Sequence, residues 1–330
     1  MDLKENLMLK GAFKLARDCA GVTADDTVVV VCDFESFEVA NQVARSCLAL
    51  GACTNMVVFE PTKSHGEPPP DMVGAAMERA TAAFLVTTKS MSHTPAVRTA
   101  RAAGCRIITM PEVYPHMLIH GAIEADFPAQ AVVAAKLRDM LTAAKTARII
   151  CEENGTDISF VLEGRTGRAV DGIARTPGSF AAPPNIESCI APVEDKTNGV
   201  YVVSASIAGV GAVSSPVRLT IENGVIKTIE GGQDADLLKE ILDRPGNPNC
   251  YRIGELGIGL NPCAIPCGSL LEDEAPLGTV HIAAGNNASN FPGGQNSAPV
   301  HIDMIAKGAT VYIDSTAILI DGIFQDDALK

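Results

Sequence analysis

Apolar and polar positions follow different patterns in the two halves of the chain. In the first half, continuous apolar runs such as 27–33 (TVVVVCD) and 82–88 (AAFLVTT) alternate with amphipathic segments such as 37–51 (FEVANQVARSCLALG). Such a run is typical of a strand buried on both faces, and a 3.6-residue apolar period is typical of a helix. Their alternation predicts βαβ units and a parallel sheet covered on both faces. Further strands are predicted at 54–60 and 105–110, and further helices at 71–80, 94–104 and 129–147.

The pattern changes near residue 150. Strand-like segments joined by tight turns follow, and Asn223-Gly224 between two apolar runs is a strong signal for a hairpin turn. A helix at 235–243 interrupts the strands. We therefore predict two domains. An α/β domain with a parallel sheet spans 1–150, and an α+β domain rich in antiparallel strands spans 151–330.

Composition and charge narrow the possible functions. Lys and Arg number 26 against 39 Asp and Glu, a formal charge of −13, whereas a nucleic-acid surface needs a basic face. The first residues are charged throughout, which is not typical of a signal peptide. The sequence contains no stretch of 18 uncharged apolar residues, so we expect no membrane span. Five of the ten cysteines, Cys19, Cys32, Cys47, Cys105 and Cys151, lie in or beside strand-like or helix-like runs. This placement is typical of small buried thiols in a reducing compartment. We therefore expect a cytoplasmic protein without nucleic-acid or membrane partners.

Metal-site and nucleotide motifs of the familiar kinds are missing from the sequence. Cys263 and Cys267 stand four residues apart, but no second Cys or His pair at matching spacing accompanies them, so packing is expected there rather than zinc. A phosphate-binding glycine loop and a GxSxG elbow are also absent. The sequence therefore gives no support to a nucleotide-binding protein or a serine hydrolase.

The candidate chemistry lies in histidines and carboxylates of the second half. His301 and Asp303 are separated by one residue in a strand-like run. Their side chains therefore share one face and can converge on one metal ion. His281 lies in another such run, and the polar, Gly-rich segment between the runs allows them to pair. Glu187 and Glu255 stand at or within apolar stretches. Burying an unpaired acid is costly, so a metal ion is a natural partner.

Other interpretations of these residues remain open from the sequence. Three carboxylates and two imidazoles suit one or two divalent ions such as Zn, Co, Mn or Fe(II). Alternatively, the His-x-Asp pair is a surface strand pair, and each glutamate pairs with an arginine such as Arg252 or Arg165. Because the whole protein is negatively charged, a strongly anionic substrate would need nearby positive side chains, such as Arg165 or Arg168, in order to bind.

His93 lies between a predicted strand and the start of a helix, a position that faces ligands in parallel sheets. It is a candidate catalytic residue that donates a proton or orients the substrate. The alternative is that Ser92 or Thr94 caps the helix and His93 is merely exposed.

The segments that hold these residues resemble the M29 family of aminopeptidases, the thermophilic metalloprotease type. They are NIESCIAPVEDKTNGVYVV (185–203), SSPVRLTIENGVIKTIEGG (214–232), IGELGIGLNP (253–262), GTVHIAAGNN (278–287) and VHIDMI (300–305), and SMSHT followed by MPEV resembles the N-terminal domain. The resemblance implies an N-terminal α/β domain, a β-rich C-terminal domain and a homodimer. It also implies a two-metal centre, whose ligands would be Glu187, Glu255, His281, His301 and Asp303.

Two departures separate the chain from the peptidases. The tyrosine ligand that follows the first histidine in that family is missing here, and the chain is shorter. The same superfamily contains the 2,5-dihydroxypyridine 5,6-dioxygenases, which bind one Fe(II) through two His and one carboxylate. In them the position of Glu255 is a His and that of His281 is apolar, yet His281, His301 and Asp303 would still make such a set. His93 matches a histidine proposed as a base in the dioxygenases.

Our first expectation is a metal-dependent hydrolase that cleaves an amide bond in a small molecule or short peptide. Its metal ions would polarise the carbonyl and supply hydroxide, and Glu187 or Glu255 would carry the proton. The alternatives are an Fe(II)-dependent dioxygenase that opens hydroxylated pyridine-type rings, and a non-enzymatic, metal-stabilised binding protein. In each case we expect a homodimer or a higher homo-oligomer.

Overall fold

A computed structural model of the chain describes residues 3–266, 270–289 and 291–329. The chain divides into two compact units. The first comprises Met1–Ala129 and Asp171–Asn185, and the second comprises Gln130–Val170 and Ile186–Lys330. The sequence pattern predicts one boundary near residue 150, whereas the chain passes between the units three times. The reason is that a short segment after the first antiparallel strands returns to add a strand to the parallel sheet.

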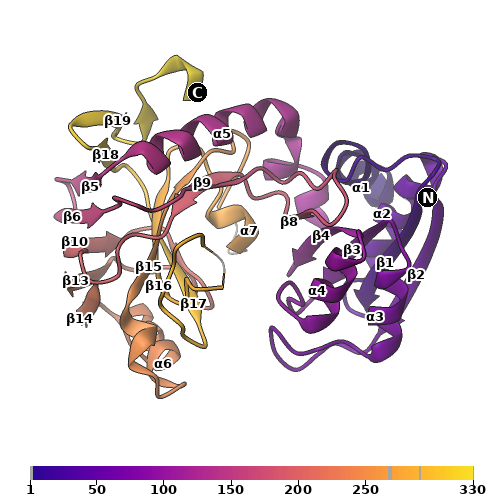
Figure 1. Cartoon of the computed structure of the whole chain (residues 1–330), viewed down its shortest axis with the longest axis horizontal. Helices are drawn as coiled ribbons and strands as arrows, with labels where there is room; N and C mark the ends of the chain where they lie inside the picture. Colours follow the sequence, from indigo (N-terminus) through magenta and orange to yellow (C-terminus); the bar gives the residue numbers. More distant parts are fainter. Residues whose placement is uncertain (1–2, 267–269, 290, 330) are drawn as a thin grey trace. The chain divides into compact units, whose positions relative to one another are not determined.

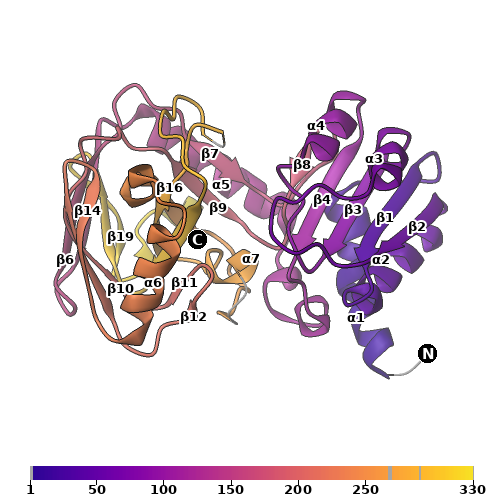
Figure 2. The ribbon, with the colours of Figure 1, turned by 90° about the horizontal axis from the view of Figure 1, so that it is seen from below.

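The first unit is built on a parallel sheet of strand order β2-β1-β3-β4-β8. Figure 2 shows α1 and α2 on one face of this sheet and α3 and α4 on the other, as the alternating pattern predicts. The strands are β1 (Thr27–Asp33), β2 (Cys53–Phe59), β3 (Ala82–Thr87), β4 (Arg106–Pro111) and β8 (Phe180–Ala181). The helices are α1 (Leu3–Lys14), its continuation as a π-helix (Leu15–Cys19), α2 (Phe37–Ala49), α3 (Asp71–Glu78) and α4 (Pro95–Ala102). The predicted α/β architecture of this part of the chain is confirmed.

Local chemistry explains where these elements begin. The Thr94 hydroxyl caps α4 by accepting a hydrogen bond from the Val97 N–H, and Pro95 occupies the first helical position, where no N–H is needed. At the other end of the sheet, Arg106 at the start of β4 pairs with Asp26 before β1, with 2.5 Å between nitrogen and oxygen and both side chains largely buried. This pair ties the amino ends of the strands together.

The second unit contains two antiparallel sheets. One has the order β14-β13-β10-β6-β5-β18-β19-β20, and the other has the order β12-β11-β17-β16-β15-β9-β7. Strands of the first sheet are β5 (Thr146–Cys151), β6 (Thr156–Val161), β10 (Asn198–Val203), β13 (Val217–Glu222), β14 (Val225–Glu230), β18 (Thr310–Ile313), β19 (Thr316–Ile320) and β20 (Ile323–Phe324). Strands of the second are β7 (Arg168–Val170), β9 (Glu187–Ile190), β11 (Ser206–Ile207), β12 (Gly211–Ala212), β15 (Ile253–Gly259), β16 (Val280–Gly285) and β17 (His301–Ala306). The predicted antiparallel character is confirmed.

Few helices accompany these strands. They are α5 (Phe127–Ala143), α6 (Gln233–Asp243) and the short α7 (Leu270–Asp273). Single 3₁₀ turns occur at Pro248–Tyr251 and Asp327–Leu329 in this unit, and at Pro115–Leu118 and Gly121–Glu124 in the first unit. The long helix and the helix after the hairpin were both predicted, whereas α7 is too short to give a periodic pattern.

The two antiparallel sheets pack against each other through buried side chains. Tyr201 of β10 is fully buried, and its hydroxyl lies 3.1 Å from the Val280 carbonyl oxygen and 3.0 Å from that of Met304. These carbonyls belong to β16 and β17, which lie side by side in Figure 1. The phenol therefore holds the hairpin of β16 and β17 from one side.

Two predictions about the whole chain can be compared with this fold. In the described part of the chain, none of the helices combines the length and apolar character needed to span a bilayer. Cys19, Cys32, Cys47 and Cys105 are buried, as predicted, and no described cysteine forms a disulfide. Cys263 is partly buried, whereas Cys267 lies outside the described residues, so their relationship stays a prediction.

Candidate metal centre

Four adjacent strands of the second antiparallel sheet bring the five predicted ligands together. The strands are β9, β15, β16 and β17, which neighbour one another in that order. Glu255 lies opposite Ala283, which in turn lies opposite Asp303, so these positions form a row across three strands. His301 and Asp303 share one face of β17, as their spacing predicts.

Glu255, His301 and Asp303 form the first group of candidate ligands. Each offers one atom, and these atoms lie within 4.8 Å of one another. His301 Nε2 lies 2.8 Å from Glu255 Oε2 and 3.4 Å from Asp303 Oδ1. The imidazole side chain of His301 is 22% exposed, whereas both carboxylates are almost fully buried. This group is therefore the one that is open to solvent.

Glu187, Glu255 and His281 form the second group, which is buried throughout. His281 Nε2 lies 3.1 Å from Glu187 Oε2 and 3.6 Å from Glu255 Oε1. Glu255 thus belongs to both groups and directs one carboxylate oxygen toward each histidine. The sequence also suggested that His281, His301 and Asp303 make a two-His, one-carboxylate set. They do not form such a group at the same 4.8 Å limit, because Glu255 stands between the histidines.

The hydrogen bonding of the cluster fits a bound cation. Glu187 Oε2 and both ring nitrogens of His281 are buried and make no hydrogen bond of good geometry, although His281 Nε2 and Glu187 Oε2 approach to 3.1 Å; buried polar groups are nearly always hydrogen-bonded. Among the described residues, only the two histidines form ion pairs with Glu187, Glu255 and Asp303. A divalent ion would satisfy the unpaired atoms and offset the three carboxylates.

The two arginines that were considered as alternative partners lie elsewhere. Arg165 forms an ion pair with Glu194. Arg252 donates to the backbone carbonyl of Glu194 at 3.2 Å. The alternative in which these arginines neutralise Glu187 and Glu255 is therefore wrong.

The charges of the cluster shift the titration of its members. Burial lowers the pKa of His281, but Glu187 and Glu255 outweigh it and hold this pKa well above its ordinary value. The pKa of His301 is likewise well above ordinary, because Asp303 and Glu255 outweigh burial. Burial raises the pKa of Glu255, yet its close polar contacts with both histidines bring this pKa far below its usual range. Without a metal, the imidazoles therefore hold protons that a metal would displace.

Space for His281 comes from a glycine on the neighbouring strand. Gly257 of β15 lies directly opposite His281. A Cβ atom at position 257 would lie 2.0 Å from His281 Nε2 and 2.2 Å from its Cε1. The ring therefore occupies the volume that any other residue at 257 would fill.

Glu274, directly after α7, is a member of the cluster that sequence reasoning missed. Its side chain is buried beside Asp303, and burial and the negative charges of Asp303 and Glu187 raise its pKa well above the usual range. The sequence shows only three consecutive acids, Glu272 to Glu274, a pattern more typical of a solvated turn. All three are buried, which no local pattern indicates.

The predicted catalytic residue His93 belongs to the first unit and is exposed. Thr94 rather than His93 caps the following helix, and the His93 carbonyl accepts a hydrogen bond from Arg98. Its ring lies 6.5 Å from that of Phe180. The catalytic role of His93 stays a prediction.

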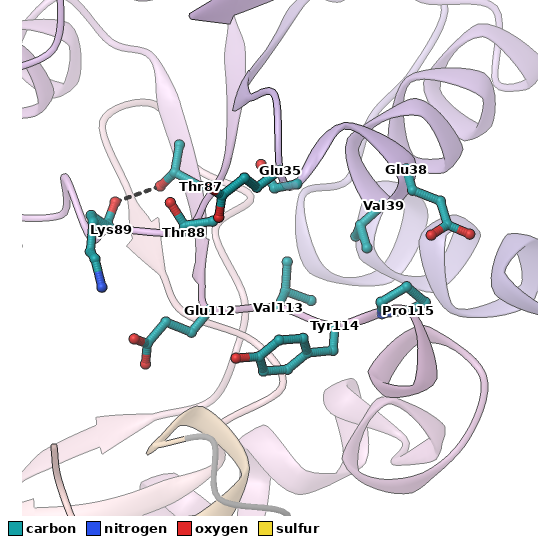
Figure 3. Close-up of a pocket in the computed structure, with 11 residues that line it drawn as sticks. Glu35, Glu38, Val39, Thr87, Thr88, Lys89, Glu112, Val113, Tyr114 and Pro115 are labelled. Carbon is teal, nitrogen blue, oxygen red and sulfur yellow. Dashed lines mark hydrogen bonds between the residues drawn. The ribbon is translucent and has the colours of Figure 1, made fainter. Parts of the chain in front are cut away.

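Figure 3 shows a pocket in the first unit, at the carboxyl ends of β1, β3 and β4. Its volume is about 310 Å³, room for one small ring, and its lining includes Glu35, Lys89, Glu112 and Tyr114. The strand order reverses at β1, between β2 and β3, which is where open parallel sheets bind ligands. Glu112 also has a positive φ of 54°, a strained backbone of the kind found at functional sites. This pocket is a second candidate ligand site.

Fold and cluster together define a two-unit protein with a candidate centre for divalent metal. The family model for 2,5-dihydroxypyridine 5,6-dioxygenase, NicX, matches residues 8–326. The chain belongs to this family. It is 26% identical over 261 residues to the 2,5-dihydroxypyridine 5,6-dioxygenase of Pseudomonas putida KT2440, an alignment that covers 72% of this chain and 70% of the relative.

Two solved structures share the fold. The structure of 2,5-dihydroxypyridine dioxygenase from Pseudomonas putida KT2440 superposes with a TM-score of 0.82 at 22% identity and covers 100% of both chains. AmpT from Thermus thermophilus superposes with a TM-score of 0.69 at 18% identity, covering 97% of this chain and 99% of AmpT. At these identities the likeness concerns the fold alone.

The family match corrects the expected function. The sequence favoured a metal-dependent hydrolase of the M29 aminopeptidase type, and this prediction is wrong, because the family model and the curated relative are those of a dioxygenase. The five ligand positions weighed most in that expectation, whereas the missing tyrosine and the shorter chain pointed the other way. The resemblance to the peptidases is retained only as a shared fold.

Proposed function

We propose that the protein is a metal-dependent dioxygenase that opens the ring of 2,5-dihydroxypyridine or a closely related hydroxylated N-heterocycle. The observation that carries the proposal is the match to the dioxygenase family along nearly the whole chain. The buried cluster supports it, since a ring-cleaving dioxygenase needs a redox-active metal and the cluster offers carboxylate and imidazole donors. The metal we propose is Fe(II).

Glu255, His301 and Asp303 are the residues that would hold the iron. When bound, Fe(II) supplies the electrons that activate O₂ toward a closed-shell aromatic ring. His301 is the partly exposed member of this group, so the substrate would approach from its side. Glu187 and His281, which are deeper, would support Glu255 from behind. This donor set departs from two histidines and one carboxylate, because Glu255 replaces one imidazole.

The protein's own groups would also handle protons. Opening a hydroxylated ring is easier once the substrate hydroxyl has lost its proton, and a nearby base contributes about 10²–10⁴-fold. We propose His93 for this task, as its match to the dioxygenase histidine suggests. A His93→Asn variant would then lower kcat by a factor in that range while leaving metal content unchanged.

The proposal is tested by oxygen consumption. The protein is purified without oxygen, loaded with Fe(II) and mixed with 2,5-dihydroxypyridine in an oxygen electrode. We expect one O₂ to be consumed for each ring opened, and His301→Ala to abolish consumption. Absence of oxygen uptake by the iron-loaded protein, with 2,5-dihydroxypyridine and with its hydroxylated analogues, would overturn the proposal.

A further inference from the structure

Residues 286–300 connect β16 with β17, and this connection is far longer than a usual hairpin loop. Its first residue remains close to its last, because the Asn286 N–H donates to the Val300 carbonyl at 2.7 Å. The next residue along is His301. The path of this loop therefore decides what lies against the His301 ring.

The loop contacts His301 at two places. His301 Nδ1 lies 2.7 Å from the Asn286 carbonyl oxygen. A carbonyl only accepts hydrogen bonds, so Nδ1 carries the proton, and Nε2 is the nitrogen that faces Glu255. Phe291, which is buried, stacks on the ring with a centroid distance of 6.0 Å and an interplanar angle of 27°. Together the two contacts fix the rotation and the tautomer of the imidazole.

Glu194, from outside the loop, anchors it through several hydrogen bonds. Glu194 Oε1 accepts from the Gln295 N–H at 2.8 Å and from Asn287 Nδ2 at 3.2 Å. Arg165 pairs with Glu194 and also donates to the Gly293 carbonyl. The Arg165 side chain is 8% exposed and that of Glu194 is 14% exposed. This largely buried ion pair therefore holds the loop at Gly293 and Gln295 through hydrogen bonds.

Two buried asparagines carry this anchoring to the start of the loop. Asn287 Oδ1 accepts from the Asn296 N–H at 2.8 Å, and Asn296 Nδ2 donates to the Gly285 carbonyl at 2.6 Å. Asn287 is fully buried and Asn296 is 4% exposed. Gly285 and Asn287 flank Asn286, so the position of the Asn286 carbonyl follows from these bonds.

We infer that Glu194, held by Arg165, is a positioning residue that orients His301 for metal binding through Asn287 and the Asn286 carbonyl. The inference rests on the proposed metal centre. Histidine ligands are commonly oriented by a hydrogen bond from the other ring nitrogen, and loss of such outer partners costs about 10–100-fold in metal affinity. Glu194 does not belong to either candidate metal group, so its effect must pass through the loop.

The experiment measures Co(II) binding, as a spectroscopic probe for the iron site, in wild type, Glu194→Gln and Asn287→Ala. We expect both variants to weaken Co(II) binding by about 10–100-fold and to change the visible absorption bands of the bound ion. Asn287→Ala leaves the Arg165–Glu194 pair in place, so it separates the loop link from the cost of an unpaired arginine. If Glu194→Gln fails to fold, Asn287→Ala alone decides.

The matched control is Asp157→Asn. Asp157 of β6 forms a two-fold ion pair with Arg148 of β5, with distances of 2.8 and 2.7 Å. Both side chains are exposed, and neither forms a hydrogen bond or ion pair with the described residues of the loop. We expect unchanged Co(II) affinity and spectra in this control. Equal affinity and spectra in wild type, Glu194→Gln and Asn287→Ala would overturn the positioning role and leave the metal centre intact. Absence of Co(II) and Fe(II) binding by the wild type would overturn the metal centre and this role together.

Discussion

The contact between Gly257 and His281 allows a sharp test of the buried half of the cluster. In Gly257→Ala the new Cβ would lie 2.0 Å from His281 Nε2, whereas ordinary contacts begin near 3.4 Å. The ring must therefore retreat by about 1.4 Å. His281 is fully buried, and overpacking of a dense interior costs about 1–3 kcal/mol. We expect a loss of this size in the free energy of unfolding and weaker binding of metal by the Glu187–Glu255–His281 group.

A double-mutant cycle isolates this contact. His281→Ala is combined with Gly257→Ala, and the four proteins are unfolded in urea without metal. Because the clash is with the imidazole, the cost of the alanine at position 257 should largely vanish in the His281→Ala background. Gly74→Ala on α3 is the matched control. Its Cβ would meet Ala96 at an ordinary 3.5 Å, so it should stabilise the helix by up to about 1 kcal/mol.

An equal cost of Gly257→Ala in both backgrounds would refute this reasoning. It would show that the glycine is needed for its backbone and not for the volume of the ring. Unchanged metal binding by Gly257→Ala would likewise show that the orientation of His281 does not matter for the ion.

Three further predictions follow from charge and burial. The pKa values of His281 and His301 are well above their ordinary value, so a metal ion must displace protons when it binds. Metal affinity should therefore rise with pH through neutrality, and calorimetry in two buffers should detect the released protons. A pH-independent affinity would contradict this. The pKa of Glu274 is raised in the folded protein, so its buried carboxylate lowers the stability of the metal-free protein once the pH exceeds the carboxyl pKa of the unfolded chain, about 4.3. Glu274→Gln should therefore be neutral or stabilising at pH 7 in urea denaturation. Marked destabilisation would contradict this expectation. Burial raises the pKa of Asp26, but hydrogen bonds, first that from Arg106, bring this pKa below its ordinary value. The Asp26–Arg106 pair therefore stabilises the folded protein above about pH 4, and its contribution is lost at lower pH. Asp26→Asn should lower the free energy of unfolding by about 3–5 kcal/mol in thermal unfolding, whereas a loss under 1 kcal/mol would contradict this.

Local patterns account for much of the fold. The run at 27–33 predicts β1 to the residue, because nothing but apolar side chains separates its polar ends. The turn at Asn223-Gly224 joins β13 to β14 with φ values of 51° and 72°, the left-handed conformations that these two residues tolerate best. The two-residue β8 was not predicted, since so short a strand has no period.

The sequence marks the five predicted ligands as candidates, but it indicates neither Glu274 nor the grouping of these side chains. Spacing places His301 and Asp303 on one face, and isolated acids in apolar runs mark Glu187 and Glu255. Which donors share one ion depends on strand order, and the sequence does not reveal that β15 separates β9 from β16. For the same reason, only the three-dimensional structure shows that Glu255 belongs to both candidate groups. Chemistry was harder still, because the same donors suit a hydrolase and a dioxygenase.

Labelling with ¹⁸O₂ tests the central claim most directly. The iron-loaded protein is given 2,5-dihydroxypyridine under ¹⁸O₂, and the product is examined by mass spectrometry. A dioxygenase places both atoms of one O₂ in the ring-opened product, so the account predicts a product with two labelled oxygens that disappears in His301→Ala. A ring-opened product that draws its oxygen from water, or recovery of the unopened ring, would contradict it.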